Sequence, residues 1–197
     1  MMTVATLLPR AAIPSLMSVE EYWDFVNLPE NHDRHFELIE GKVIEMSRPS
    51  QFHGMICMEI GYLLRHWLGQ QQQPGYIAMN DAGVILHEEP ATVVGPDVAY
   101  YPLTEVPKKW AEVAPTLAVE VLSPNDKPSE VNTKLQEYLT SGTRLVWLID
   151  PESRTVTIHR PNSEPRTLSA QDELSGGEEL PGFSCQVADL FKMPTSA

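Results

Sequence analysis

Apolar side chains recur every three or four residues in three segments of the chain, which is the spacing of helices that bury one face. The first segment predicts a short helix over about 18–27, opened by a capping box in which Ser18 and Glu21 satisfy each other's backbone amides. The longest helix is expected over about 50–72, with a serine as its N-cap. A further helix is expected over 129–140.

Shorter apolar or alternating runs between these segments predict the strands. Segments 35–39 and 42–46 flank a glycine turn and are expected to form a hairpin. Residues 116–122 (TLAVEVL) are nearly all apolar, which is typical of a central strand covered on both faces. The remaining predicted strands are 76–79 together with 83–86, then 97–101, 144–149 and 155–160. This order predicts an α/β fold in the broad sense (α+β, with a mixed sheet). Helices are expected to flank a central mixed β-sheet, to which β-hairpins are added.

The length of 197 residues fits one domain. We expect a single domain over 18–191, with short tails at 1–17 and 192–197. The 17 prolines favour many short elements over a helical bundle. Residues 1–8 are largely apolar, but Pro9 ends the run and no basic segment precedes it, so a signal peptide is not expected.

Acidic residues outnumber basic ones by 27 to 14, and the formal net charge is −13. This balance argues against a protein that coats nucleic acid through a basic surface, but not against an enzyme that holds a few phosphates through metal ions. Cys57 and Cys185 have no CxxC spacing, so we expect a reducing cytoplasm rather than a disulfide framework or a structural zinc site. No apolar run reaches the about 18 residues of a membrane span. No motif for a nucleotide cofactor or a serine hydrolase is present.

Two carboxylates interrupt the apolar patterns. Glu120 lies inside its apolar strand, where a carboxylate costs several kcal/mol unless it is paired or bound to a metal. Asp97 opens a strand directly after Gly95-Pro96. The alternatives are a glutamate that reaches solvent or an arginine, and an aspartate that caps its own turn. Two carboxylates brought together by a sheet favour a cation between them, and oxygen ligands suit Mg²⁺ or Mn²⁺ better than zinc.

Three further side chains are candidates for the same chemistry, and a cysteine on the long helix is considered separately. Lys134 flanks the apolar stripe of its helix, so it either extends into solvent or points inward to neutralise a developing charge. His53 lies on the buried face of the long helix, where a satisfied core histidine is the commoner case. Glu37 alternates with apolar neighbours in its strand, which is typical of a solvated face. Cys57 has no evident base partner, and a thiol nucleophile is not expected.

The order of these features resembles the motif of the PD-(D/E)XK nuclease superfamily: Asp97 follows a proline, Glu120 lies in an apolar strand, and a helix comes next. The chain is similar, from about Ser18 to Leu190, to the family named putative restriction endonuclease (domain of unknown function 820). The matching stretches are 36–41 (FELIEG), 47–50 (SRPS) with His53, 95–100 (GPDVAY), 118–124 (AVEVLSP), 134–138 (KLQEY) and 142–151 (GTRLVWLIDP).

The resemblance implies a restriction-endonuclease-like core and a divalent-metal site. Asp97 and Glu120 take the metal-ligand positions, with the Val121 carbonyl as a further ligand. The motif lysine would stand two residues after the acid, where this chain has Leu122, so the resemblance implies that Lys134 of the following helix replaces it. Glu37 and His53 match positions that the family shares.

The expected function is therefore metal-dependent hydrolysis of nucleic-acid phosphodiester bonds, with Mg²⁺ or Mn²⁺ as the cofactor and DNA favoured over RNA. Asp97 and Glu120 would hold the metal, and Lys134 would stabilise charge in the transition state. Glu37 and His53 would assist them as further catalytic residues. A homodimer is expected from the resemblance. The alternatives are a catalytically silent homodimeric interaction module on the same fold and a phosphodiesterase of small molecules.

Overall fold

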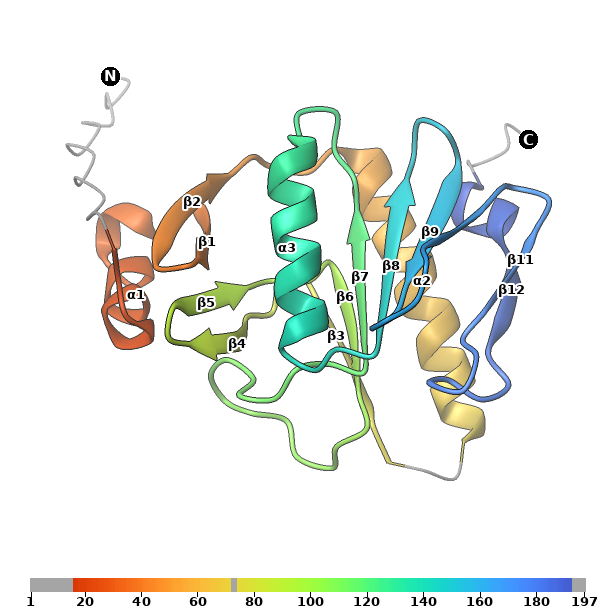
Figure 1. Cartoon of the computed structure of the whole chain (residues 1–197), viewed down its shortest axis with the longest axis horizontal. Helices are drawn as coiled ribbons and strands as arrows, with labels where there is room; N and C mark the ends of the chain where they lie inside the picture. The colour runs from red at the N-terminus through yellow and green to blue at the C-terminus, as the bar shows by residue number, and fades with distance from the viewer. Residues whose placement is uncertain (1–15, 72–73, 193–197) are drawn as a thin grey trace, which may run out of the picture.

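Two larger β-sheets form the framework of the protein in the computed structural model, which describes residues 16–71 and 74–192 (Figure 1). Helices α1 (Val19–Val26), α2 (Gln51–Gln70) and α3 (Pro128–Thr140) pack around them. Short 3₁₀ helices follow α1 (η1, Pro29–Asn31) and end the described chain (η2, Val187–Phe191). No helix among the described residues is long and apolar enough to span a membrane.

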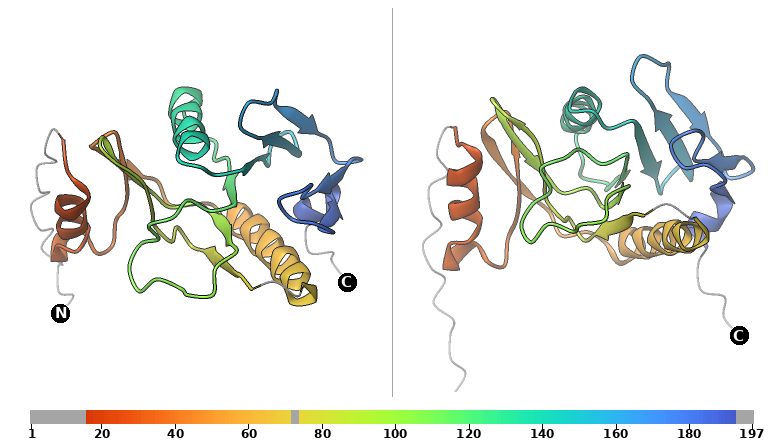
Figure 2. Two further views of the ribbon diagram at one scale, coloured as in Figure 1. Left: turned by 60° about the horizontal axis from the view of Figure 1, so that its bottom comes forward. Right: turned by 90° about the horizontal axis from the view of Figure 1, so that it is seen from below.

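The six-stranded sheet has the order β10-β9-β8-β7-β6-β3 and is mixed, since β7 and β8 are parallel and the other pairs are antiparallel. Its strands are β3 (Tyr76–Met79), β6 (Val98–Tyr101), β7 (Leu117–Val121), β8 (Leu145–Asp150), β9 (Thr155–His159) and β10 (Arg166–Leu168). Helices α2 and α3 cover its opposite faces (Figure 2). The predicted mixed sheet flanked by helices is confirmed.

Strand β7 is the central element that the apolar run predicted. It pairs with β6 on one side and β8 on the other. Its alternate side chains enter two cores: Val119 and Val121 pack in the cluster that contains α2, and Ala118 packs in the cluster that contains α3. Glu120 therefore extends from the face that α3 covers.

The four-stranded sheet has the order β2-β1-β5-β4 and carries α1. The predicted hairpin forms its first pair, β1 (His35–Ile39) and β2 (Lys42–Met46), and the turn uses positive φ angles at Glu40 and Gly41. The second pair is β4 (Val84–Glu88) and β5 (Ala91–Val94).

The sequence suggested that segments 76–79 and 83–86 belong together, but they do not. Strand β3 pairs with β6 and β4 pairs with β5, so the two segments lie in different sheets. Asn80 and Asp81, both with positive φ, turn the chain from one sheet to the other. Strand β5 was not predicted, because its four residues directly follow a proline turn and show no alternation.

The C-terminal segment adds a small antiparallel pair, β11 (Glu173–Ser175) and β12 (Ser184–Gln186). Its buried Leu174, Leu180 and Phe183 join the core on the α2 side of the main sheet. The expected tails, 1–17 and 192–197, lie almost wholly outside the described residues. Residues 16, 17 and 192 are the exceptions. Met17 is buried, and its amide donates to the Gly41 carbonyl (2.8 Å).

Ser50 caps helix α2 as predicted, and its hydroxyl accepts from the amide of His53 (3.1 Å). A Ser50→Ala variant is expected to lose about 1 kcal/mol of unfolding free energy, because the first turn loses a partner for one of its free amides. Urea denaturation would measure the loss against Ser163→Ala, a replacement of an exposed loop serine. Equal midpoints for the two variants would contradict the prediction.

Candidate metal centre

The five side chains that the sequence singled out line one cleft of about 130 Å³ between the two sheets. Strand β1 supplies Glu37, α2 supplies His53, the segment before β6 supplies Asp97, β7 supplies Glu120 and α3 supplies Lys134. These elements are far apart in the chain, so only the fold brings their side chains together.

Glu120 is held by two residues one helical turn apart on α3. Its Oε2 accepts from the Lys134 ammonium (2.9 Å), and its Oε1 accepts from the Tyr138 hydroxyl (2.6 Å). The carboxylate is therefore neither at a solvated strand end nor paired with an arginine. A largely buried carboxylate with a charged donor on one oxygen and a neutral donor on the other is held in a fixed orientation.

Lys134 points inward, which excludes the solvated alternative. Its ammonium contacts Glu37 Oε1 (2.7 Å) as well as Glu120, and the Gly95 carbonyl lies at 3.5 Å. The side chains of Glu37, Lys134 and Glu120 are 7%, 12% and 18% exposed. The ammonium nitrogen thus has three protein oxygens within 3.5 Å.

The expectation that Glu37 faces solvent was wrong. Glu37 is buried, and its carboxylate accepts from the Gly95 amide (3.1 Å) in addition to binding Lys134. The alternation itself is correct, because Leu38 packs on the α1 side while Ile39 packs on the α3 side. The sequence pattern separates the two faces of β1, but it does not reveal that α3 covers the second one.

Asp97 bridges the strand framework and α2. Its Oδ2 accepts from the Val121 amide (2.7 Å), and its Oδ1 lies 3.2 Å from His53 Nε2. Because Val98 at the start of β6 pairs with Val119, Asp97 directly before β6 lies next to Glu120 of β7. The carboxylate thus does more than cap its own turn.

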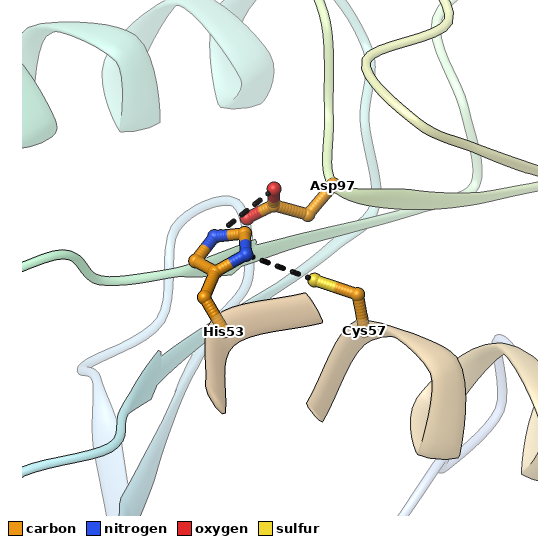
Figure 3. Close-up of side chains that lie close together, drawn as sticks. All are labelled: His53, Cys57 and Asp97. Atoms are coloured by element: carbon orange, nitrogen blue, oxygen red, sulfur yellow. Dashed lines mark hydrogen bonds and ion pairs between the residues drawn. The ribbon is translucent and has the colours of Figure 1, made fainter. Parts of the chain in front are cut away.

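His53 lies between Asp97 and Cys57 (Figure 3). Its Nδ1 is 3.4 Å from the Cys57 sulfur, so the thiol has the basic neighbour that the sequence did not reveal. Burial raises the pKa of the Cys57 thiol, and the nearby Asp97 raises it further. Cys57 is also absent from the cleft lining. A protonated thiol outside the cleft is not a nucleophile.

His53, Cys57 and Asp97 also form a group of potential metal ligands, whose donor atoms lie within 4.8 Å of one another. Figure 3 shows the imidazole between the sulfur and the carboxylate, with a different ring nitrogen facing each. This His–Cys–Asp group is one candidate for a cation. The carboxylates of Glu37, Asp97 and Glu120, which line the cleft, are the other.

Burial governs the protonation of the site. It raises the pKa of the Glu120 carboxyl, and Asp97 and Glu37 add to the effect while Lys134 opposes it. Burial alone would lower the pKa of Lys134, but the charges of Glu120 and Glu37 outweigh it and raise that pKa. Burial would likewise lower the pKa of His53, but the hydrogen bond and charge of Asp97 raise it, as does a hydrogen bond to the Val121 backbone.

The types of donor that line the cleft are those that a divalent cation prefers. Three carboxylates, those of Glu37, Asp97 and Glu120, share the site with one ammonium, so negative charge is in excess. Each carboxylate has about four acceptor positions, and the observed contacts leave room for further ones. Oxygen donors of this kind suit Mg²⁺ or Mn²⁺.

Two residues of the site were not identified from the sequence. Asp81 lines the cleft, and burial together with Asp97 raises the pKa of its carboxyl. It lies in a turn, where an aspartate gives no distinctive signal. Tyr138 was assigned to the apolar face of its helix, although its spacing of four residues from Lys134 would have placed both on one side.

Comparison with known proteins supports the family that the sequence resembles. A family model described as Uma2, putative restriction endonuclease, matches residues 20–188. The chain belongs to this family. The Uma2 model spans all five elements that supply the cleft, from β1 to α3. A search of the curated proteins finds no match.

A solved structure has the same fold. It is described as a putative nuclease belonging to domain-of-unknown-function family 820, from Anabaena variabilis. The superposition has a TM-score of 0.76 at 22% sequence identity and covers 89% of this chain and 97% of that one. At this identity the likeness concerns the fold, and the restriction-endonuclease-like architecture expected from the sequence is confirmed.

Proposed function

We propose that this Uma2 protein is a metal-dependent endonuclease that hydrolyses phosphodiester bonds of DNA. Asp97 and Glu120 would hold Mg²⁺ or Mn²⁺, with the Val121 carbonyl as a further ligand. The observation that carries the proposal is that these two acids, one directly before β6 and one in β7, line a cleft that also contains Lys134. The homodimer and the cytoplasmic location expected from the sequence remain part of the proposal.

A divalent cation in this site would act as a Lewis acid toward a phosphodiester and would lower the pKa of a water molecule. The protein's own residues would set the geometry. Glu120 is fixed at both oxygens, and Asp97 is fixed by the Val121 amide and His53. Lys134 would stabilise the charge that develops on the phosphate, while Glu37 keeps the ammonium in place. His53 would orient water or a ligand beside Asp97.

The acidic chain favours recognition of a few phosphates over broad backbone contact. A net charge of −13 leaves few cations to displace counterions along a duplex. Within the cleft, the Lys134 ammonium is already paired with two carboxylates. We therefore expect the metal to carry most of the attraction for the scissile phosphate.

Cleavage of supercoiled and linear DNA in Mn²⁺ tests the proposal. The wild-type protein is expected to nick the supercoiled substrate, EDTA is expected to stop the reaction, and Asp97→Ala is expected to be inactive because a metal ligand is lost. Equal nicking by wild type and Asp97→Ala would reject the assignment. Calorimetry that detects no Mg²⁺ or Mn²⁺ uptake would instead favour the silent interaction module.

A further inference from the structure

Tyr138 and Lys134 divide the Glu120 carboxylate between them. The tyrosine hydroxyl donates to Oε1 and the ammonium to Oε2, from positions one turn apart on α3. The two contacts differ in kind, because one is made by a neutral group and the other by a cation. A divalent cation bound at Oε2 would compete with the ammonium and would leave the contact between the hydroxyl and Oε1 intact.

The environment of Tyr138 makes its hydroxyl a fixed donor. The side chain is fully buried in the core between α3 and the main sheet. A buried hydroxyl without a partner costs free energy, and the Glu120 carboxylate supplies that partner at 2.6 Å.

We propose that Tyr138 is a positioning residue for the metal centre. It holds Oε1 of Glu120 in place, so that Oε2, the oxygen bound by Lys134, is the one exchanged when a divalent cation arrives. Glu37 retains the ammonium during this exchange, because it contacts Lys134 independently of Glu120. The inference rests on the proposed function, since it assumes that Glu120 is a metal ligand.

Calorimetric titration of the full chain with Mn²⁺ tests the inference. Tyr138→Phe removes the hydroxyl and little else, and we expect its Mn²⁺ dissociation constant to rise by about 10- to 100-fold, the usual cost of losing a residue that orients a metal ligand. The Mn²⁺ concentration for half-maximal DNA cleavage should rise by the same factor. At saturating Mn²⁺ the cleavage rate and the KM for DNA should approach the wild-type values, which a general structural defect would not allow.

Tyr100→Phe is the matched control. Tyr100 is also buried in the main sheet, but it packs on the α2 side, edge-on to Trp67. Its variant is expected to bind Mn²⁺ like wild type. If Tyr138→Phe does not fold, Tyr138→Met replaces it in the test. It removes the same donor with a flexible side chain that fills the space differently, and its Mn²⁺ dissociation constant should rise by the amount expected for Tyr138→Phe.

The outcomes separate this inference from the proposed function. If the wild type takes up Mn²⁺ and both Tyr138 variants bind it as tightly, the positioning role is overturned while the metal centre stands. If the wild type takes up neither Mn²⁺ nor Mg²⁺, the proposed function itself fails. A rise in the Mn²⁺ dissociation constant that is confined to the Tyr138 variants supports both the positioning role and the metal centre.

Discussion

A Lys134→Met variant is expected to lose about 3–5 kcal/mol of unfolding free energy at neutral pH. The ammonium lies between Glu37 and Glu120, and the substitution leaves two buried carboxylates without their cation. Breaking a buried ion pair by removing one partner has a cost of this size. Since domains are commonly stable by only about 5–15 kcal/mol, the loss would be readily visible in a denaturant titration.

The stability that the Lys134→Met variant loses should depend on pH in a definite direction. Burial already raises the pKa of Glu120, and without the opposing ammonium that pKa should rise further. The folded variant then binds more protons than the unfolded chain above the ordinary glutamate pKa, so its stability falls as pH rises through that window and recovers in acid. A deficit that is the same at pH 5 and pH 8 would contradict the explanation.

A double variant provides the control for the charge argument. Lys134→Met combined with Glu37→Gln removes one of the two carboxylates that lack a cation in the single variant, and it should recover part of the lost stability. If the double variant is less stable than Lys134→Met alone, packing rather than charge determines the loss.

A Glu120→Gln variant is expected to cleave DNA at least about 10³-fold more slowly than wild type in Mn²⁺. The amide has nearly the same shape and can still accept from Tyr138, but it removes the negative charge that would hold the metal. Losses of this order follow the removal of electrostatic groups that act in the transition state. Initial nicking rates of supercoiled DNA would measure it, together with calorimetric Mn²⁺ binding.

Glu178→Gln is a suitable comparison, because it makes the same chemical change at an exposed glutamate of the C-terminal segment. That variant should cleave at the wild-type rate. A loss of less than 10-fold for Glu120→Gln, with Mn²⁺ binding retained, would mean that Glu120 is not a ligand of a catalytic metal.

The local elements of this fold were largely predictable because short-range signals specify them. The capping box at Ser18 and Glu21 is present, and Ser50 caps α2. The hairpin over 35–46 has the turn that Glu40-Gly41 favours. Each of these features depends on residues within a few positions of one another, so no knowledge of the tertiary structure was needed.

The candidate site was predictable to the extent that its residues break a local pattern. Glu120 was conspicuous as a charge within an apolar strand, and it does lie in a buried site. Glu37 and Tyr138 break no pattern: a glutamate alternating with apolar residues and a tyrosine on an apolar helix face are both ordinary. Their roles became visible only through their contacts with Lys134 and Glu120.

The sequence by itself determined the helices, most strands, the mixed sheet and the two acids whose burial requires compensation. Only the tertiary structure decided that 76–79 and 83–86 enter different sheets, that Lys134 points inward, and that Glu37 is covered by α3. The physical reason is the separation in sequence over which each kind of interaction acts. Periodicity and capping act over a few residues, whereas the environment of a charged side chain is set by elements that lie up to a hundred residues away in the chain.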